Sequence, residues 1–233
     1  MGAFRGAGIR VPLEDVVTST VFGPLEFMSA DDRRRSIDLV CEALAVEIPE
    51  PRGPMRALFW PRLPVSDASL RTRYSEPDLM LADDVGPVMV VEIKWGAPLS
   101  ERELAAQWTA IGSSGRRRAV HLLLVQEPGI YRRDMDLDRE MVDAAGMGPW
   151  PLQMRNWRSL TAVEVLSRQA DASEPVRAWA SAVTAFLRRE HRLSMHGWDE
   201  IGLMGVEEVD WMARQHWFQG FHPVDGHGGW WKG

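Results

Sequence analysis

One lysine of this chain occupies a position where a charge needs a specific partner. Of the 27 lysine and arginine residues, only Lys94 and Lys232 are lysines. Lys94 lies in the most apolar stretch of the sequence, Val88–Trp95, which also contains Glu92. A buried ammonium group is costly unless it is paired or bound, and its compact charge does chemistry that a guanidinium does not. We therefore expect Lys94 to belong to a functional site.

The neighbouring carboxylates indicate what that site contains. Side chains of a strand alternate between its faces, so Glu92 and Lys94 share one face. Asp78 begins a second apolar run, and the segment Asp83–Pro87 between the two runs has the residues of a hairpin turn. A hairpin centred on Val85 puts Asp78 opposite Glu92, with Cβ atoms roughly 4.5–5.5 Å apart. Two carboxylates at that separation can hold one divalent cation between them.

The pair Pro77-Asp78, followed by Glu92 and Lys94, resembles the signature of the PD-(D/E)XK nuclease superfamily, which has the restriction-endonuclease-like fold. The resemblance covers about residues 10–130. It implies that Asp78 and Glu92 bind Mg²⁺, with Mn²⁺ as a substitute, and that Lys94 orients or helps to deprotonate the attacking water. The alternative is a Glu92–Lys94 pair that only neutralises itself.

The resemblance also assigns roles on two predicted helices. Ser100 and Glu103 form a capping-box pattern, which predicts a helix that ends near residue 111. Many members of the superfamily carry a glutamine on this helix that points back at the metal, and Gln107 is in that place; the alternative is a solvated surface glutamine. An acid on the first helix is an additional metal ligand in several branches, and Glu14 matches it, although acids at a helix N-terminus also complement the helix dipole.

A basic cluster is the predicted contact with nucleic acid. The net charge of the chain is −6, so a protein that binds a polyanion needs a local positive surface. Arg116, Arg117 and Arg118 follow the Gln107 helix, and we expect them to contact phosphates at the edge of the site. The alternative is a solvated loop in an arginine-rich chain. His121, in the next strand, is predicted to be a core histidine with satisfied hydrogen bonds rather than a ligand.

The hydrophobic periodicity predicts an α/β fold in which an αβββαβ core with a mixed central sheet is flanked by helices. Residues 1–160 are expected to form this nuclease-like core, and residues 161–233 a mainly helical, Trp-rich C-terminal extension packed on it. The expected elements of the core are helices over 12–22 and 31–46, strands over 55–60, 77–82 and 88–95, a helix over 101–111 and a strand over 119–125.

One more strand is expected over 152–157, and helices are expected over 161–168, 176–187 and 207–218. Five of the eleven tryptophans fall in the last forty or so residues of the chain, which is typical of an interface or base-stacking surface but equally of a segment that closes a core. Histidines near the end of the chain are expected to belong to a solvated tail.

Composition sets the remaining expectations. The fractions of hydrophobic residues, 45%, and charged residues, 26%, are those of a globular protein. There is no apolar run long enough to span a membrane and no apolar signal-peptide core, so we expect a cytoplasmic protein. The resemblance to small bacterial members of the superfamily implies a Mg²⁺-dependent nuclease acting on nucleic acid, DNA in the first instance, in defence or repair. The sequence leaves the oligomeric state open, with a homodimer as one alternative.

Two other functions stay open at this stage. The acidic net charge and the Trp-rich C-terminal third favour a catalytically inactive nuclease-fold module that serves partner or nucleic-acid binding. A different metal-dependent hydrolase on the same scaffold is the third hypothesis. The intact Asp78, Glu92 and Lys94 set favours the nuclease.

Overall fold

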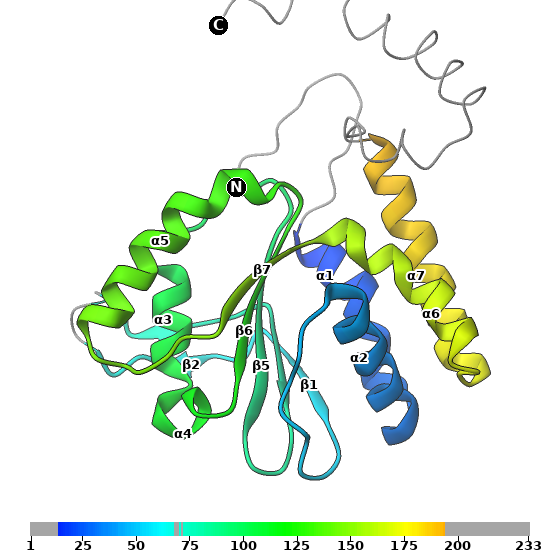
Figure 1. The fold of residues 1–233 in the computed structure, drawn as a ribbon, viewed down its shortest axis with the longest axis horizontal. Helices are drawn as coiled ribbons and strands as arrows, with labels where there is room; N and C mark the ends of the chain where they lie inside the picture. The colour runs from blue at the N-terminus through cyan, green and yellow to red at the C-terminus, as the bar shows by residue number, and fades with distance from the viewer. Residues whose placement is uncertain (1–13, 68–69, 71, 194–233) are drawn as a thin grey trace, which may run out of the picture. The chain divides into compact units, whose positions relative to one another are not determined.

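The computed structural model describes residues 14–67, 70 and 72–193, and the elements below lie in these ranges (Figure 1). The helix predicted over 207–218 and the Trp-rich end of the chain lie outside them. None of the described helices is both long and apolar enough to cross a membrane.

The centre of the fold is a mixed five-stranded sheet. Its spatial order is β1-β4-β5-β6-β7; the pairs β1/β4 and β4/β5 are antiparallel, and β5/β6 and β6/β7 are parallel. The two middle strands, β5 and β6, are almost entirely apolar because helices cover both of their faces. The strand bounds are β1 Arg56–Phe59, β4 Leu79–Ala82, β5 Pro87–Lys94, β6 Val120–Val125 and β7 Leu152–Asn156.

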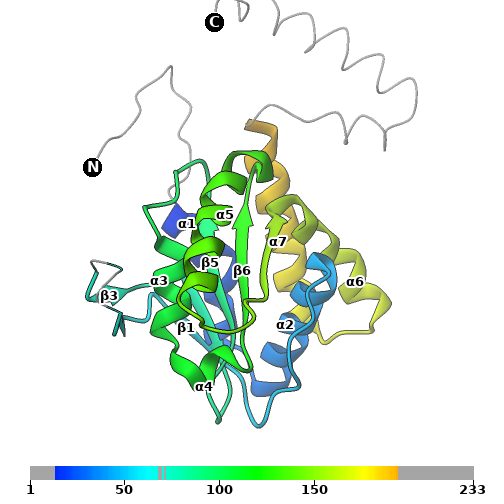
Figure 2. The same ribbon diagram turned by 60° about the vertical axis from the view of Figure 1, so that its left-hand side comes forward.

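Helices cover the sheet in two layers (Figures 1 and 2). One layer packs in a core with Leu79, Val91 and Ile93, and consists of α1 Glu14–Phe22, η1 Gly23–Phe27, α2 Ala30–Leu44, α6 Val163–Gln169 and α7 Glu174–Leu193. The other layer packs over Val90 and Leu123 and consists of α3 Glu103–Ala110, α4 Gly112–Arg116 and α5 Pro128–Ala144. The 3-10 helix η3, Trp157–Ala162, joins β7 to α6.

A two-stranded ribbon between β1 and β4 was not predicted. Its strands, β2 Leu63–Pro64 and β3 Tyr74–Ser75, pair antiparallel, and each contacts α3. The Arg62 guanidinium lies 4.1 Å from the centre of the Tyr74 ring and stacks on it. Strands of two residues carry too little periodicity for a sequence to reveal them.

The general fold class is confirmed: an α/β protein with a mixed sheet flanked by helices, with the predicted elements in the predicted order. The main addition is α5, because the sequence left the helicity of the connection over 126–150 undecided. Its buried face consists of Tyr131, Met135, Asp138 and Val142, and an acid among the apolar positions blurred the helical pattern. Beyond the boundary expected at residue 160, Val176, Trp179 and Leu187 of α7 pack in one core with the sheet. The compact unit continues to Glu190.

Candidate active site

Alternation along β5 sends its polar residues to one face. Met89, Val91 and Ile93 join the core under α1 and α2, whereas Val90 joins the core under α3. Glu92 and Lys94 share the Val90 face, as the sequence predicted. They are only 3% and 7% exposed, so each side chain needs a partner inside the protein.

The register of the hairpin brings Asp78 to the same place. Leu79 pairs with Val91 and Met80 with Val90, which is the register that a turn centred on Val85 requires. One step further, Asp78 lies beside the Glu92 end of β5, and its Oδ2 accepts a hydrogen bond of 2.7 Å from the backbone N–H of Ile93. The other carboxylate oxygen, Oδ1, has no hydrogen-bond partner in the part of the chain that the structure describes.

The Glu92 carboxylate is held by two donors. The Lys94 ammonium lies 2.5 Å from Oε1, and the amide Nε2 of Gln107 donates a hydrogen bond of 2.5 Å to Oε2. Burial raises the pKa of Glu92 well above its ordinary value, the charges of Asp78 and Glu103 add to this effect, and the ammonium of Lys94 opposes it. The Lys94 ammonium therefore favours the ionised form of Glu92, against the burial that disfavours it.

Glu103 is a member of the site that the sequence did not reveal as one. Its two carboxylate oxygens each lie 3.3 Å from the Lys94 ammonium. Burial lowers the pKa of Lys94, but the carboxylates of Glu92 and Glu103 outweigh burial and hold that pKa above its ordinary value. The lysine thus stays charged. The only signal in the sequence was the capping-box pattern, which explained Glu103 by local helix chemistry alone.

Glu14 ties the first helix to the same end of β5. Its Oε1 accepts a hydrogen bond of 2.6 Å from the backbone N–H of Trp95. The structure therefore brings Glu14 close to the other sequence-predicted residues, although one of its oxygens is occupied by the backbone. Burial raises the pKa of Asp78 to about 6, and the negative charges of Glu14 and Glu103 contribute to the shift.

Gln107 is a core residue, and the surface alternative for it is wrong. It is 1% exposed, and its Oε1 lies 2.9 Å from His121 Nε2. The other ring nitrogen of His121, Nδ1, accepts a hydrogen bond of 3.1 Å from the indole N–H of Trp150. Burial lowers the pKa of His121 to about 3, so the imidazole is neutral. His121 was predicted to be a core histidine with satisfied hydrogen bonds, and its contacts with Gln107 and Trp150 agree with that prediction.

The helix that carries Gln107 is anchored from a distant element. The backbone N–H groups of Leu104 and Ala105 donate to Oδ2 of Asp138 on α5, at 3.0 and 3.1 Å. Only half of the predicted capping box is present, the 2.8 Å bond from the Ser100 N–H to Glu103 Oε2. Two N–H groups of the first turn of α3 are thus satisfied by a buried acid, whereas the N–H of Glu103 donates to the carbonyl oxygen of Ser100 at 3.2 Å.

The carboxylate oxygens of this site are the type of ligand that Mg²⁺ prefers. Mg²⁺ is usually bound by one or two carboxylates, and waters or phosphate oxygens complete its octahedron. Among the described residues, one oxygen of Asp78 has no hydrogen-bond donor, and each oxygen of Glu92 has a second lone pair beside its bond to Lys94 or Gln107. Within residues 14–193, apart from the undescribed positions 68, 69 and 71, no group of three or more His, Cys, Asp or Glu is arranged to hold a metal ion.

The predicted position of the arginine cluster is wrong. In the parallel pair β5/β6, Met89 aligns with Val120 and Lys94 with Val125, so residues 116–118 precede β6 at the end far from Lys94. Five residues of strand separate the two ends by about 16 Å. The Arg118 guanidinium is also engaged, by the two carboxylate oxygens of Asp83 at 2.8 and 3.0 Å.

The other two arginines of the cluster, Arg116 and Arg117, do not pair with Asp83 in the described part of the chain. Arg116 donates to the carbonyl oxygen of Thr109 at 3.3 Å, which keeps it against the end of α3. Arg117 is exposed to solvent. A nucleic-acid contact by Arg117 stays a prediction, but at a surface away from the carboxylates.

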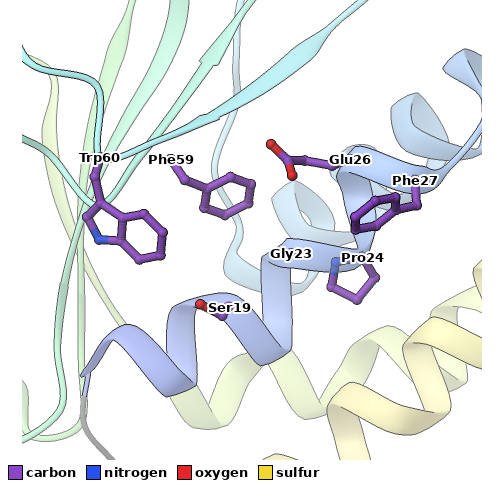
Figure 3. A pocket seen from close by; sticks show the side chains of 7 residues that line it. All are labelled: Ser19, Gly23, Pro24, Glu26, Phe27, Phe59 and Trp60. Atoms are coloured by element: carbon purple, nitrogen blue, oxygen red, sulfur yellow. The ribbon is translucent and has the colours of Figure 1, made fainter.

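An aromatic groove lies at the end of β1 (Figure 3). The backbone N–H of Trp60 donates to the carbonyl oxygen of Asp78 at 3.2 Å, and Trp60 has a left-handed backbone with φ of 46°. Phe27, on η1, is 90% exposed at the opposite wall. The groove has a volume of about 680 Å³ and is lined by Ser19, Gly23, Pro24, Glu26, Phe27, Phe59 and Trp60.

Comparisons of the chain with models of known protein families, with curated proteins and with solved structures gave no match. The geometry of the site therefore carries the functional proposal.

Proposed function

We propose that the protein is a metal-dependent phosphodiesterase with a restriction-endonuclease-like core, and that it hydrolyses nucleic acid, DNA in the first instance. The observation that carries the proposal is the placement of Glu92. It is a buried carboxylate held by Lys94 and Gln107, and the carboxylate of Asp78 adjoins it across the hairpin. A pair of carboxylates with an ammonium alongside is suited to in-line attack of water on a phosphodiester.

In this proposal Asp78 and Glu92 hold Mg²⁺, which when bound supplies Lewis-acid activation of water and neutralises phosphate charge. The Lys94 ammonium donates a hydrogen bond to the attacking water and stabilises charge that develops on the scissile phosphate. Gln107 holds the Glu92 carboxylate in one orientation from the buried side. Glu103 and Glu92 both pair with the Lys94 ammonium, and the two contacts together restrict the position of the ammonium.

The test is a cleavage assay on circular and linear DNA, single-stranded DNA and RNA, with Mg²⁺ or Mn²⁺. Asp78→Asn is the informative variant because asparagine can still accept the Ile93 N–H bond while it lacks the charge that a metal ligand needs. We expect cleavage by the wild type, loss of at least about 100-fold in Asp78→Asn and Glu92→Gln, and normal cleavage by Glu101→Gln, whose side chain is 89% exposed. Equal cleavage by all four proteins would contradict the proposal.

The inactive binding module is the second candidate, and one observation favours it. Both oxygens of Glu92 already have donors within the protein, so the cluster is electrically satisfied without a metal. Calorimetric titration with Mn²⁺ separates the two functions. Binding that is lost in Asp78→Asn supports the phosphodiesterase, whereas no binding together with no cleavage of any substrate supports the module.

A further inference from the structure

A chain of hydrogen bonds links the partly buried indole of Trp150 to the Glu92 carboxylate. It runs from Trp150 Nε1 to His121 Nδ1 at 3.1 Å, from His121 Nε2 to Gln107 Oε1 at 2.9 Å, and from Gln107 Nε2 to Glu92 Oε2 at 2.5 Å. The members come from three elements and from the segment that leads into β7. Two of them, His121 and Gln107, are 0% and 1% exposed, so water does not compete for these bonds.

The direction of the chain is set at its Trp150 end. An indole N–H can only donate, so His121 Nδ1 must be the accepting nitrogen. A neutral imidazole has one N–H, which therefore lies on Nε2 and donates to an oxygen of Gln107. The amide nitrogen of Gln107 must then face Glu92, where it donates to the carboxylate. Each bond thus fixes the polarity of the next.

The opposite orientation of the Gln107 amide is incompatible with Trp150. If the amide were turned over, its nitrogen would donate to His121 Nε2, and both ring nitrogens would have to be acceptors. A neutral imidazole cannot accept at both nitrogens, and a doubly protonated imidazole would direct an N–H at the indole N–H. Burial lowers the pKa of His121 to about 3, which excludes the charged ring at neutral pH.

A histidine at this position has no justification in packing alone. The rest of β6 consists of valine and leucine, which pack in the same environment without a buried polar group. The ring of His121 stacks on Trp108, with centroids 6.0 Å apart, and it is tilted against Trp150 at 5.6 Å. The stacking fixes the plane of the ring so that Nε2 points at Gln107.

We propose that His121 is a positioning residue for Glu92: it acts through Gln107, and Trp150 selects the tautomer that makes the amide donate to the carboxylate. The inference rests on the proposed function where it takes Glu92 to be a metal ligand. A partner of this kind holds a ligating carboxylate in one orientation, and its removal typically weakens metal binding 10- to 100-fold.

The first experiment reads the tautomer directly. Nitrogen-15 NMR of the metal-free protein distinguishes the protonated from the bare ring nitrogen of His121. We expect Nε2–H in the wild type and a mixture of tautomers in Trp150→Phe, which keeps the aromatic ring but removes the indole donor. A wild-type ring protonated at Nδ1, or a spectrum unchanged in Trp150→Phe, would overturn the inference.

The second experiment tests whether His121 acts through Gln107. Mn²⁺ affinity is measured for His121→Leu, Gln107→Leu and the double variant, with Leu124→Val as a packing control in the same strand. We expect each single variant to bind 10- to 100-fold more weakly, the double variant to bind no more weakly than Gln107→Leu, and the control to bind normally. Recovery of affinity in His121→Gln, which restores an N–H donor, is also expected.

Independent effects of His121 and Gln107, which multiply in the double variant, would overturn the positioning role. The tautomer measurement applies even if a leucine variant does not fold, because Trp150→Phe preserves shape. Failure of the wild type to bind Mn²⁺ overturns the proposed function, whereas the wrong tautomer overturns the positioning inference alone.

Discussion

At the scale of single residues, the site depends on the difference between lysine and arginine. Lys94 is 7% exposed, and its ammonium lies between the carboxylates of Glu92 and Glu103. A guanidinium has the same charge, but it is planar and wider, and it presents its donors in a fixed fork. The chain uses arginine at nearly every other basic position. The small space between the two carboxylates explains why position 94 is a lysine instead.

We therefore predict that Lys94→Arg cleaves DNA at least about 100-fold more slowly than the wild type, as expected when one positioned charge no longer reaches the reacting group. The melting temperature should change little, because the charge that Glu92 requires is kept. Initial cleavage rates and thermal unfolding measure the two effects. Arg117→Lys, at an exposed position, is the matched control. Full activity of Lys94→Arg would show that Lys94 serves only as an internal counter-ion.

At the scale of elements, the position of α3 depends on α5. Arg102, just before α3, has a left-handed backbone with φ of 59°, and the N–H groups of the first turn bond to the buried Asp138. Because α3 carries Glu103 and Gln107, this acid sets the distance of both side chains from β5. Burial raises the pKa of Asp138 to about 6, and its bonds to Ala105 and Leu104 oppose that shift.

This shift predicts a dependence of stability on pH. The pKa of Asp138 is raised in the folded state above the value of about 3.9 in an unfolded chain, so the folded state binds the proton more tightly. The free energy of unfolding should then fall as pH rises from about 4 to about 6 and level off above that range. Urea unfolding between pH 4 and 7 should show a shallower dependence in Asp138→Asn than in the wild type.

Two further variants separate charge from capping at this position. Asp138→Ala removes the acceptor as well as the charge and should lower the free energy of unfolding at pH 7 by about 1–2 kcal/mol. Asp136→Asn, at a side chain that is 69% exposed, should leave the pH dependence unchanged. Asp78 has a raised pKa too, so only the difference between wild type and Asp138→Asn reports on Asp138. An identical slope in the two proteins would contradict the prediction.

At the scale of the whole molecule, a second ion pair secures the end of the sheet away from the site. Asp83 is buried and accepts hydrogen bonds from the backbone N–H groups of Arg52, Val85 and Gly86, as well as from the Arg118 guanidinium. These bonds join the segment before β1, the β4–β5 turn and the loop before β6. The Arg118 guanidinium holds the pKa of Asp83 well below its usual range.

We predict that Asp83→Asn and Arg118→Ala each lower the melting temperature by about 5–10 °C, because the carboxylate of Asp83 is buried and its interaction with the partly exposed Arg118 guanidinium is lost in both variants. Arg117→Ala should have no effect on it. Since the pKa of Asp83 is lowered in the folded state, the pair stabilises the protein above the unfolded pKa, and its contribution is lost as pH falls through the folded pKa. The difference between wild type and Asp83→Asn should therefore shrink in strong acid. Melting curves that match for Arg118→Ala and Arg117→Ala would refute the structural role of Arg118.

Local patterns in the sequence were sufficient to predict the strand-based half of the site. The alternation along β5 places Glu92 and Lys94 on one face, and the Asp83–Pro87 turn sets the register that brings Asp78 beside them. Both follow from chemistry within about fifteen residues. The α/β class and the order of elements follow from periodicities of the same short range.

Tertiary structure alone decided the partners of those residues. The chain from Trp150 to Gln107, the Asp138 cap on α3 and the Asp83–Arg118 pair consist of bonds between groups 14 to 35 residues apart, on separate segments of the chain. Their formation depends on how helices pack on the sheet, and no periodicity encodes which polar side chains then meet. The sequence thus determined which residue types share a face of β5, whereas the packing of α3 and α5 on that face determined which of them hold Glu92 in place.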